Sequence, residues 1–218
     1  MSDKNEIIEK IKETGVLPVI RANSKAEARR VVDAVGEGGI KTIEVTMTVP
    51  NAVDLIAELT KDYGGELVVG AGTGLNAEAA AKCIDAGAQF IISPAADPET
   101  IRYCNEKSIV VMPGALTPTE IVAAWNAGAD FVKIFPASAL GGASYLKAIK
   151  APLPHIKLIP TGGVSLATAA AFIKAGAEAV GVGGELVDLA AIRENRPEVL
   201  TERARDFLKI VREARKDQ

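Results

Sequence analysis

Eight short runs of β-branched and other apolar residues recur along this chain of 218 residues, and segments with helical spacing separate them. The spacing predicts strands at residues 16–21, 42–47, 67–73, 90–94, 109–115, 131–137, 157–163 and 179–184. Residues that commonly begin helices follow five of these runs, at Ser24, Asn76, Asp97, Thr117 and Ser165. Strands that alternate with helices are typical of right-handed βαβ units, so we expect a parallel sheet.

A glycine-containing turn that ends a helix and leads into a strand is repeated four times. The turns lie at residues 38–41, 86–89, 127–130 and 175–178, and they precede the second, fourth, sixth and eighth strands. The repeating unit is therefore a pair of βα modules. A fourfold repeat of such pairs favours a closed (β/α)8 TIM barrel over an open doubly wound sheet, which has edges. We expect an additional N-terminal helix at residues 6–13 that covers one end of the barrel and a C-terminal helix at residues 198–215.

Composition and charge limit the classes of protein to which the chain belongs. With 48% hydrophobic and 24% charged residues, the chain suits one domain over residues 1–218. The formal net charge is −3 and the basic residues are dispersed, so we expect no nucleic-acid partner. The polar start and the lack of any apolar run of about 18 residues predict a cytoplasmic protein without a membrane partner.

The cysteine and histidine content narrows the possible chemistry. Cys83 and Cys104 lie in helix-like segments and form neither a disulfide framework nor a zinc ligand set, so we interpret them as packing residues. His155 is the only histidine, which excludes a metal site with several histidines and leaves one candidate for a Ser-His-Asp triad. We therefore expect no metal, and an aldol-type reaction in this chain would need an amine.

Lys133 lies in the apolar run 131–136, where a buried strand is expected and a charge is costly. Burial favours the neutral form of an amine, and a neutral lysine is a nucleophile that forms Schiff bases with carbonyl substrates. Alternatively, the lysine extends its ammonium to water over apolar neighbours. The segment by itself leaves both interpretations open.

Four other predicted strands also end in polar side chains. Together with Lys133 they bring Arg21, Glu44, Thr73 and Thr161 to the carboxyl ends of the strands. In a barrel these ends form one mouth, where catalytic groups lie. We therefore expect these side chains to converge on a substrate.

Apart from Lys133, Glu44 is the residue of this group with the clearest expected catalytic role. Thr46 and Thr48 lie on the same face of its strand. A carboxylate beside a nucleophilic amine performs the proton transfers that carbinolamine and Schiff-base steps require. Alternatively, Glu44 only neutralises a buried lysine or arginine.

Two glycine-rich turns follow the seventh and eighth predicted strands, at residues 160–164 and 181–185. They place Gly162, Gly163, Gly183 and Gly184 where barrels of this type commonly bind phosphate through backbone N–H groups. Either turn alone is explained by a tight βα loop. The pair in this position favours a phosphate site.

Taken in order, these motifs resemble the KDPG aldolase family, the class I 2-keto-3-deoxy-6-phosphogluconate / 4-hydroxy-2-oxoglutarate aldolases. The matching segments are residues 16–21, 43–46, 70–73, 92–94, 112–114, 131–137 and 160–164. They cover nearly the whole predicted barrel.

The resemblance implies roles for particular residues. Lys133 would be the Schiff-base lysine and Glu44 the general acid and base, with no cofactor. The implied lining of the pyruvyl portion is Thr73, Pro94 and Phe135, and the implied phosphate ligands are Gly162, Gly163, Gly183 and Gly184. A homotrimer is also implied.

The chain departs from the family pattern at Thr48 and Glu185. Many members have an arginine at the position of Thr48 near the substrate carboxylate, so our hypothesis is that Arg21 and Thr73 bind that carboxylate here. Glu185 would repel phosphate if it pointed inward, but alternation along the strand predicts that it faces away and opens the next helix.

The substrate stays open between several possibilities. The galactonate-series epimer and the shorter 4-hydroxy-2-oxoglutarate remain alternatives to the gluconate-derived substrate. A non-aldolase enzyme on a phosphate-binding barrel, or a barrel without activity, is also compatible with the sequence.

Overall fold

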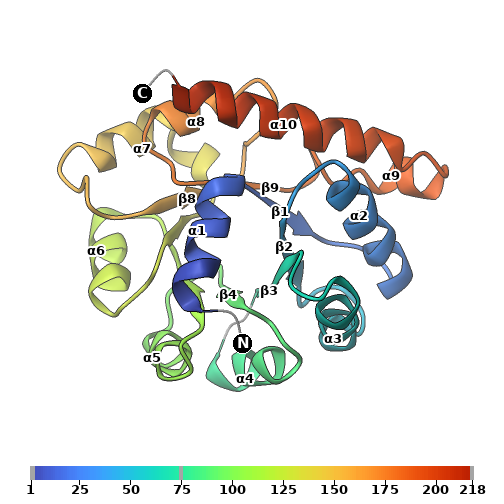
Figure 1. Ribbon diagram of the computed structural model, residues 1–218. Coiled ribbons are helices and arrows are strands. Elements are labelled where there is room, and N and C mark those ends of the chain that lie inside the picture. The colour runs from blue at the N-terminus through green and yellow to red at the C-terminus, as the bar shows by residue number, and fades with distance from the viewer. Residues whose placement is uncertain (1–2, 74–75, 217–218) are drawn as a thin grey trace.

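The computed structural model describes residues 3–73 and 76–216 as an α/β fold in which parallel strands alternate with helices (Figure 1). The strands are β1 (Val16–Ile20), β2 (Thr42–Thr46), β3 (Val68–Gly72), β4 (Phe90–Ile92), β5 (Val110–Met112), β6 (Gly114–Ala115), β7 (Val132–Ile134), β8 (Leu158–Pro160) and β9 (Val180–Val182). The helices are α1 (Lys4–Thr14), α2 (Lys25–Glu37), α3 (Ala52–Tyr63), α4 (Ala77–Asp85), α5 (Pro98–Glu106), α6 (Pro118–Asn126), α7 (Ala143–Lys150), α8 (Ala169–Lys174), α9 (Leu189–Arg193) and α10 (Glu198–Lys216), with a 3-10 turn η1 (Ala137–Leu140).

The strands form two groups that curl around a common interior (Figure 1). One sheet has the order β5-β4-β3-β2-β1-β9 and the other has the order β6-β7-β8, and the strand pairs are parallel. Isolated bridges join Leu158 to Ala177 and Thr161 to Gly181, between the β8 and β9 segments. The predicted parallel α/β fold of the TIM type is confirmed at this level.

The predicted run 109–115 forms two strands, β5 and β6, instead of one. The interruption falls at Pro113, which has no N–H to donate to a ladder. Its carbonyl oxygen still accepts a hydrogen bond from the Lys133 N–H at 2.9 Å. The break therefore leaves the contact with β7 in place.

Local side-chain bonds explain where most of the helices begin. The side chains of Ser24, Asn76, Asp97 and Thr117 each accept a hydrogen bond from the backbone N–H three residues later. These predicted starts are confirmed. The start at Ser165 is wrong, because Thr168 stands at the N-cap position of α8.

The two ends of the chain pack differently against the sheet. The predicted N-terminal helix is α1, and its buried residues Ile7, Ile8 and Ile11 join the inner core cluster (Figure 1). Helix α10 agrees with the predicted helix at residues 198–215, but the short helix α9 precedes it and was not expected.

No helix in the described part of the chain combines the length and the apolar character needed to cross a membrane.

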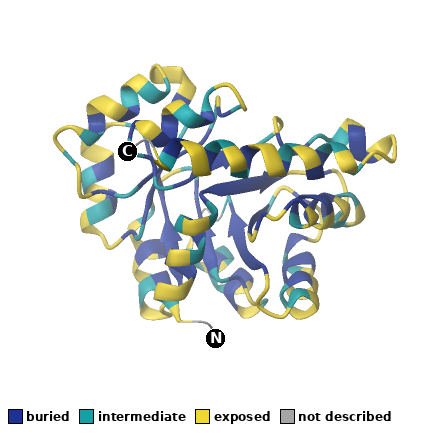
Figure 2. Ribbon diagram, turned by 45° about the horizontal axis from the view of Figure 1, so that its top comes forward, coloured by how far each residue is buried: buried dark blue, intermediate teal, exposed yellow. Residues whose placement is uncertain are grey.

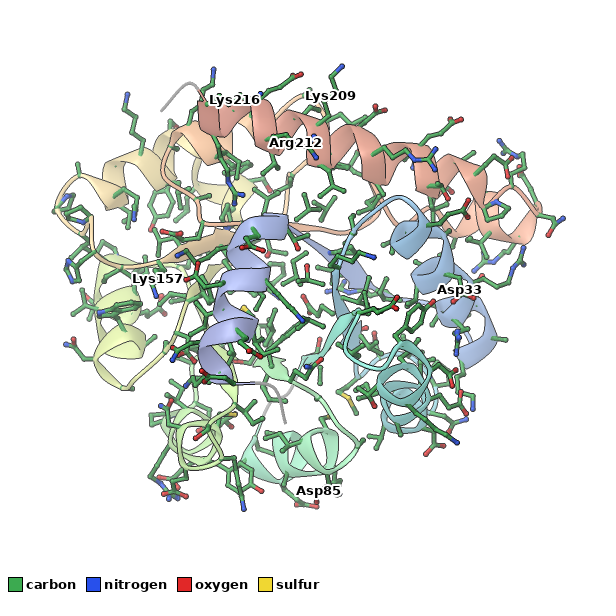
Figure 3. The ribbon with its side chains drawn as sticks, in the orientation of Figure 1. Asp33, Asp85, Lys157, Lys209, Arg212 and Lys216 are labelled. Carbon is green, nitrogen blue, oxygen red and sulfur yellow. The ribbon has the colours of Figure 1, made fainter. Side chains whose placement is uncertain are left out.

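The core has an inner and an outer part. The inner cluster contains Leu17 of β1, Phe90 of β4 and Phe131 just before β7, whereas the outer cluster fills the space between strands and helices. Buried residues occupy the strands and the inner sides of the helices in Figure 2. Exposed charged residues such as Lys209 and Lys216 lie along the outer edge of α10 (Figure 3).

The interpretation of the cysteines as packing residues is confirmed. Cys83 and Cys104 are free and fully buried, in α4 and α5 respectively. Burial raises the pKa of the Cys83 thiol to about 11 and that of Cys104 to about 12.

Gly70 and Gly36 provide a matched test of how tightly this interior is packed. A Cβ at Gly70 would overlap the ring of Phe90, whereas a Cβ at Gly36 in α2 meets nothing within 4 Å. We expect Gly70→Ala to lower the free energy of unfolding by roughly 1–3 kcal/mol through overpacking. We expect Gly36→Ala to raise it by about 0.5–1 kcal/mol because alanine favours the helix. Urea unfolding measures both, and equal midpoints for the two variants would contradict the packing described here.

Candidate active site

A cavity of about 630 Å³ lies at the carboxyl ends of β1, β8 and β9. Of the five predicted polar residues, Arg21 and Thr161 line it, whereas Glu44, Thr73 and Lys133 do not. Phe135 lines it too, and so do the four glycines of the two predicted turns, Gly162, Gly163, Gly183 and Gly184, and Gly181. Pro94 lies instead in a neighbouring cavity of about 430 Å³, which Phe135 also lines. The ring of Phe135 therefore borders both cavities.

Lys133 lies beside these cavities, within the wall of the sheet. It pairs in register with Gly114 of β6, which lines the smaller cavity, and with Ile159 of β8. Its side chain is only 7% exposed, and its Nζ lies 5.4 Å from the centre of the Phe135 ring and 3.8 Å from Glu44 Oε1. The ammonium does not extend to bulk water, so the structure does not support the alternative in which it does.

Glu44 is more deeply buried than Lys133, with its side chain 1% exposed. Within the described part of the chain, its Oε1 has no hydrogen-bond partner. Burial raises the pKa of Glu44, while the positive charges of Lys133 and Arg21 act in the opposite direction. A buried carboxyl group with an unused oxygen beside an amine is suited to proton transfer.

The Glu44 side chain has room because the neighbouring strand carries a glycine. Gly72 of β3 faces it, and a Cβ at that position would overlap the carboxylate. The sequence interpretation assigned no role to Gly72. A glycine within a strand is nevertheless a recognised signal that another group approaches closely, and that signal was present.

Threonine hydroxyls connect the ends of β1 and β2. Thr46 Oγ1 donates to the carbonyl oxygen of Ile20 at 2.9 Å and lies 2.7 Å from Thr48 Oγ1. Ile20 directly precedes Arg21, so this contact holds the end of β1 from which Arg21 extends into the cavity. Thr46 and Thr48 are thus in contact, although Thr48 lies in the turn that follows β2 and not on the strand itself.

Thr73 and Thr161 end their strands in different ways. Thr73 follows β3 with a φ of 65°, in the left-handed region. Thr161 is buried, and its Oγ1 occupies space that a Cβ at Gly181 would need. Both lie at the carboxyl ends of strands, as predicted.

The first glycine turn exposes backbone donors to the cavity. Gly162 and Gly163 have φ values of 95° and 74°, which favour glycine. Within the described residues, the N–H groups of Gly163 and Val164 donate no hydrogen bond, and both residues line the cavity. Such donors suit an anion.

Glu185 does not open a helix, contrary to the expectation from alternation. It is exposed and lines the cavity, and Asp188 caps the following helix α9 instead. The chain continues past β9 for several residues before that helix, so strand alternation does not extend to Glu185.

The single histidine is remote from these residues. His155 precedes the amino end of β8 and packs edge-on against Trp125, with ring centroids 6.3 Å apart. Among residues 3–73 and 76–216, no group of three or more His, Cys, Asp or Glu side chains is placed to hold a metal ion.

A family model described as KDPG and KHG aldolase matches residues 7–202 of the chain. The chain belongs to this family. The resemblance predicted from the sequence motifs is therefore confirmed.

Individual relatives agree with this assignment. The KHG/KDPG aldolase of Escherichia coli (strain K12) is 38% identical, over 72% of this chain and 74% of the relative. The 2-dehydro-3-deoxy-6-phosphogalactonate aldolase of the same organism is 34% identical, over 91% of this chain and 95% of the relative. A KDPG aldolase from Legionella pneumophila, solved with pyruvate as a covalent carbinolamine, has a TM-score of 0.82 and 28% identity, covering 91% of this chain and 96% of that one.

The raised pKa of Glu44 is testable by following its carboxyl carbon by NMR as the pH changes. We expect a midpoint above the ordinary value near 4.5, because burial disfavours the charged form. Lys133→Met should raise the midpoint further, since the lysine charge lowers it. The folded state then holds this proton more tightly than the unfolded state does. The stability contributed by Glu44 therefore decreases as the pH rises from 4.5 through the raised pKa.

A midpoint at or below 4.5 in the wild type would contradict this electrostatic description of Glu44. A lower midpoint in Lys133→Met would contradict the assigned effect of the lysine charge.

Proposed function

We propose that this chain is a class I aldolase that reversibly cleaves 2-keto-3-deoxy-6-phosphogluconate (KDPG) to pyruvate and glyceraldehyde 3-phosphate. The observation that carries the proposal is the buried pair of Lys133 and Glu44, 3.8 Å apart, with a carboxylate oxygen that has no other partner among the described residues. An amine and a proton-transfer group at one mouth are what Schiff-base chemistry requires. Membership of the aldolase family supports the same conclusion.

The first half of the reaction forms the Schiff base. The Lys133 amine attacks the C2 ketone of the substrate and produces a carbinolamine. Glu44 supplies the proton with which the C2 hydroxyl leaves as water, and an iminium remains. The nearby Phe135 ring, 5.4 Å from Nζ, limits the access of water to the amine.

The second half breaks the C3–C4 bond. Glu44, or a water molecule that it positions, removes the proton of the C4 hydroxyl, and the iminium accepts the electron pair of the broken bond. Glyceraldehyde 3-phosphate leaves and an enamine remains. Protonation of the enamine at C3 and hydrolysis release pyruvate and restore the lysine, without a metal or organic cofactor.

The substrate extends from the lysine toward the glycine turns. Arg21 and Thr73 bind the carboxylate at C1, while Pro94, Phe135 and Thr161 line the pyruvyl portion. The phosphate binds at the backbone of Gly162, Gly163, Gly183 and Gly184. This assignment is supported by the cavity that Arg21, Thr161 and these glycines share.

Two related substrates are second candidates. Relatives named as phosphogalactonate aldolases are 34–35% identical to this chain, which favours the epimeric KDPG analogue. The name of the Escherichia coli KHG/KDPG aldolase favours 4-hydroxy-2-oxoglutarate, which would give pyruvate and glyoxylate. Cleavage rates for the two epimers and the shorter keto acid, measured side by side, would rank them.

We further infer a closed (β/α)8 barrel formed by one domain over residues 1–218. The bridges between the β8 and β9 segments support closure on one side. The near continuity of β5 and β6 across Pro113 supports it on the other. We also propose that the chain acts in the cytoplasm as a homotrimer. A similar chain in a cage designed by fusing symmetric oligomeric domains, with a TM-score of 0.84, supports an oligomer.

The catalytic roles are tested by coupling pyruvate release to lactate dehydrogenase. Lys133→Met should abolish cleavage of KDPG, because no Schiff base forms. Glu44→Gln should lower kcat by about 10²–10⁴-fold, the usual contribution of general acid–base catalysis. Full activity of Lys133→Met would contradict the proposal, provided that both variants remain folded by circular dichroism.

The role of Arg21 is tested in the condensation direction. Arg21→Ala should raise KM for pyruvate by about 10–100-fold, because hydrogen bonds to a charged group contribute roughly 1.5–3 kcal/mol. Arg30→Ala is a matched control, since Arg30 donates to Asn195 and does not line the cavity. An unchanged KM in Arg21→Ala would show that the carboxylate binds elsewhere.

A further inference from the structure

The turn between β8 and α8 is held in shape by a side chain that lies outside the cavity. Thr168 follows the glycine turn 162–165 and is not among the residues that line the cavity. A mobile pair of glycines would present its N–H groups in many directions, because glycine has the widest conformational freedom. Something must therefore restrict this turn if it is to recognise an anion.

Thr168 makes three contacts with the turn through one hydroxyl oxygen. Its Oγ1 accepts a hydrogen bond from the Ser165 N–H at 2.8 Å and donates to the Gly163 carbonyl oxygen at 2.8 Å. Ser165 Oγ lies 3.3 Å from the same oxygen. A hydroxyl has one donor and two acceptor positions, so these contacts use its full capacity.

These bonds determine which donors of the turn remain available. The Ser165 N–H is occupied by Thr168, whereas the Gly163 and Val164 N–H groups donate to no described residue. With the Gly163 carbonyl oxygen held by Thr168, the adjoining peptide unit, which carries the Val164 N–H, cannot rotate freely. The threonine thus restricts the direction of a donor that it does not itself provide.

The other end of the turn is hydrogen-bonded to the segment that follows β7, the strand that contains Lys133. The Ala137 N–H donates to the Thr161 carbonyl oxygen at 2.9 Å, and Ala137 begins η1, shortly after β7. Gly163 packs so closely against Ser138 of η1 that a Cβ there would clash. The turn therefore has a defined position relative to Lys133.

We propose that Thr168 is a positioning residue that preorganises the 162–165 turn for the phosphate of the substrate. This inference rests on the proposed phosphate-dependent aldolase function. Thr168 does not touch the substrate. Because its hydroxyl already restricts the turn in the free protein, the turn loses less conformational freedom when the phosphate binds. The affinity for the phosphate end of the substrate increases, and the chemistry at Lys133 is unaltered.

Thr168→Val tests the inference, because valine keeps the shape of the side chain and removes the hydroxyl. We expect KM for KDPG and the inhibition constant of inorganic phosphate to rise together by about tenfold, the effect of losing one or two hydrogen bonds. Exchange of the pyruvate methyl protons with D2O, followed by NMR, requires the Schiff base but no phosphate. We expect that exchange rate to stay at the wild-type value.

Two further variants serve as controls. Thr168→Ser keeps the hydroxyl and should restore wild-type KM and phosphate inhibition. Thr60→Val removes a hydroxyl that bonds to the Ile56 carbonyl oxygen in α3, outside the cavity, and should change none of the three readouts.

The possible failures are distinguishable. Wild-type values of KM and phosphate inhibition in Thr168→Val would overturn the role of Thr168. So would a loss of methyl exchange equal to the loss of cleavage, because that would indicate a general structural effect. If inorganic phosphate neither inhibits nor binds the wild type, the proposed phosphate site itself is wrong and the inference fails with it.

Discussion

Burying Glu44 and Lys133 together is the constraint on which the arrangement of the site depends. Removing two charges from water costs several kcal/mol each, and a separation of 3.8 Å between Nζ and Oε1 returns only part of that cost. The structure adds no hydrogen bond to Glu44 Oε1 from the described residues. An arrangement of this kind contributes little to stability, and it agrees with the catalytic role that we propose for the pair.

The parallel sheet makes this burial possible by bringing residues from distant segments to one end. Glu44 and Lys133 come from different strands, and the inner core cluster packs beneath them. Gly72 leaves space for the carboxylate. On the cavity side, the first glycine turn lies against η1, where Gly163 packs closely on Ser138. The fold thus places the buried Glu44–Lys133 pair apart from the glycine backbone that we propose to bind phosphate.

Much of the site could be predicted from the sequence because it depends on strand periodicity. Lys133 and Glu44 are polar residues within apolar strands and Thr161 follows one, and a parallel sheet brings such strands side by side. The sequence did not predict the break at Pro113, helix α9 or the position of Glu185. Each of these depends on where the hydrogen bonding between neighbouring strands ends. The contacts of Thr168 were also missed, since they depend on the left-handed conformations of Gly162 and Gly163.

The central claim is that Lys133 forms a covalent bond with a keto acid, and reductive trapping tests it most directly. The protein is incubated with pyruvate and sodium borohydride, digested, and mapped by mass spectrometry. The account predicts a reduced pyruvate adduct on the peptide that contains Lys133, and none without pyruvate. An unmodified Lys133, or an adduct on another lysine instead, would contradict it.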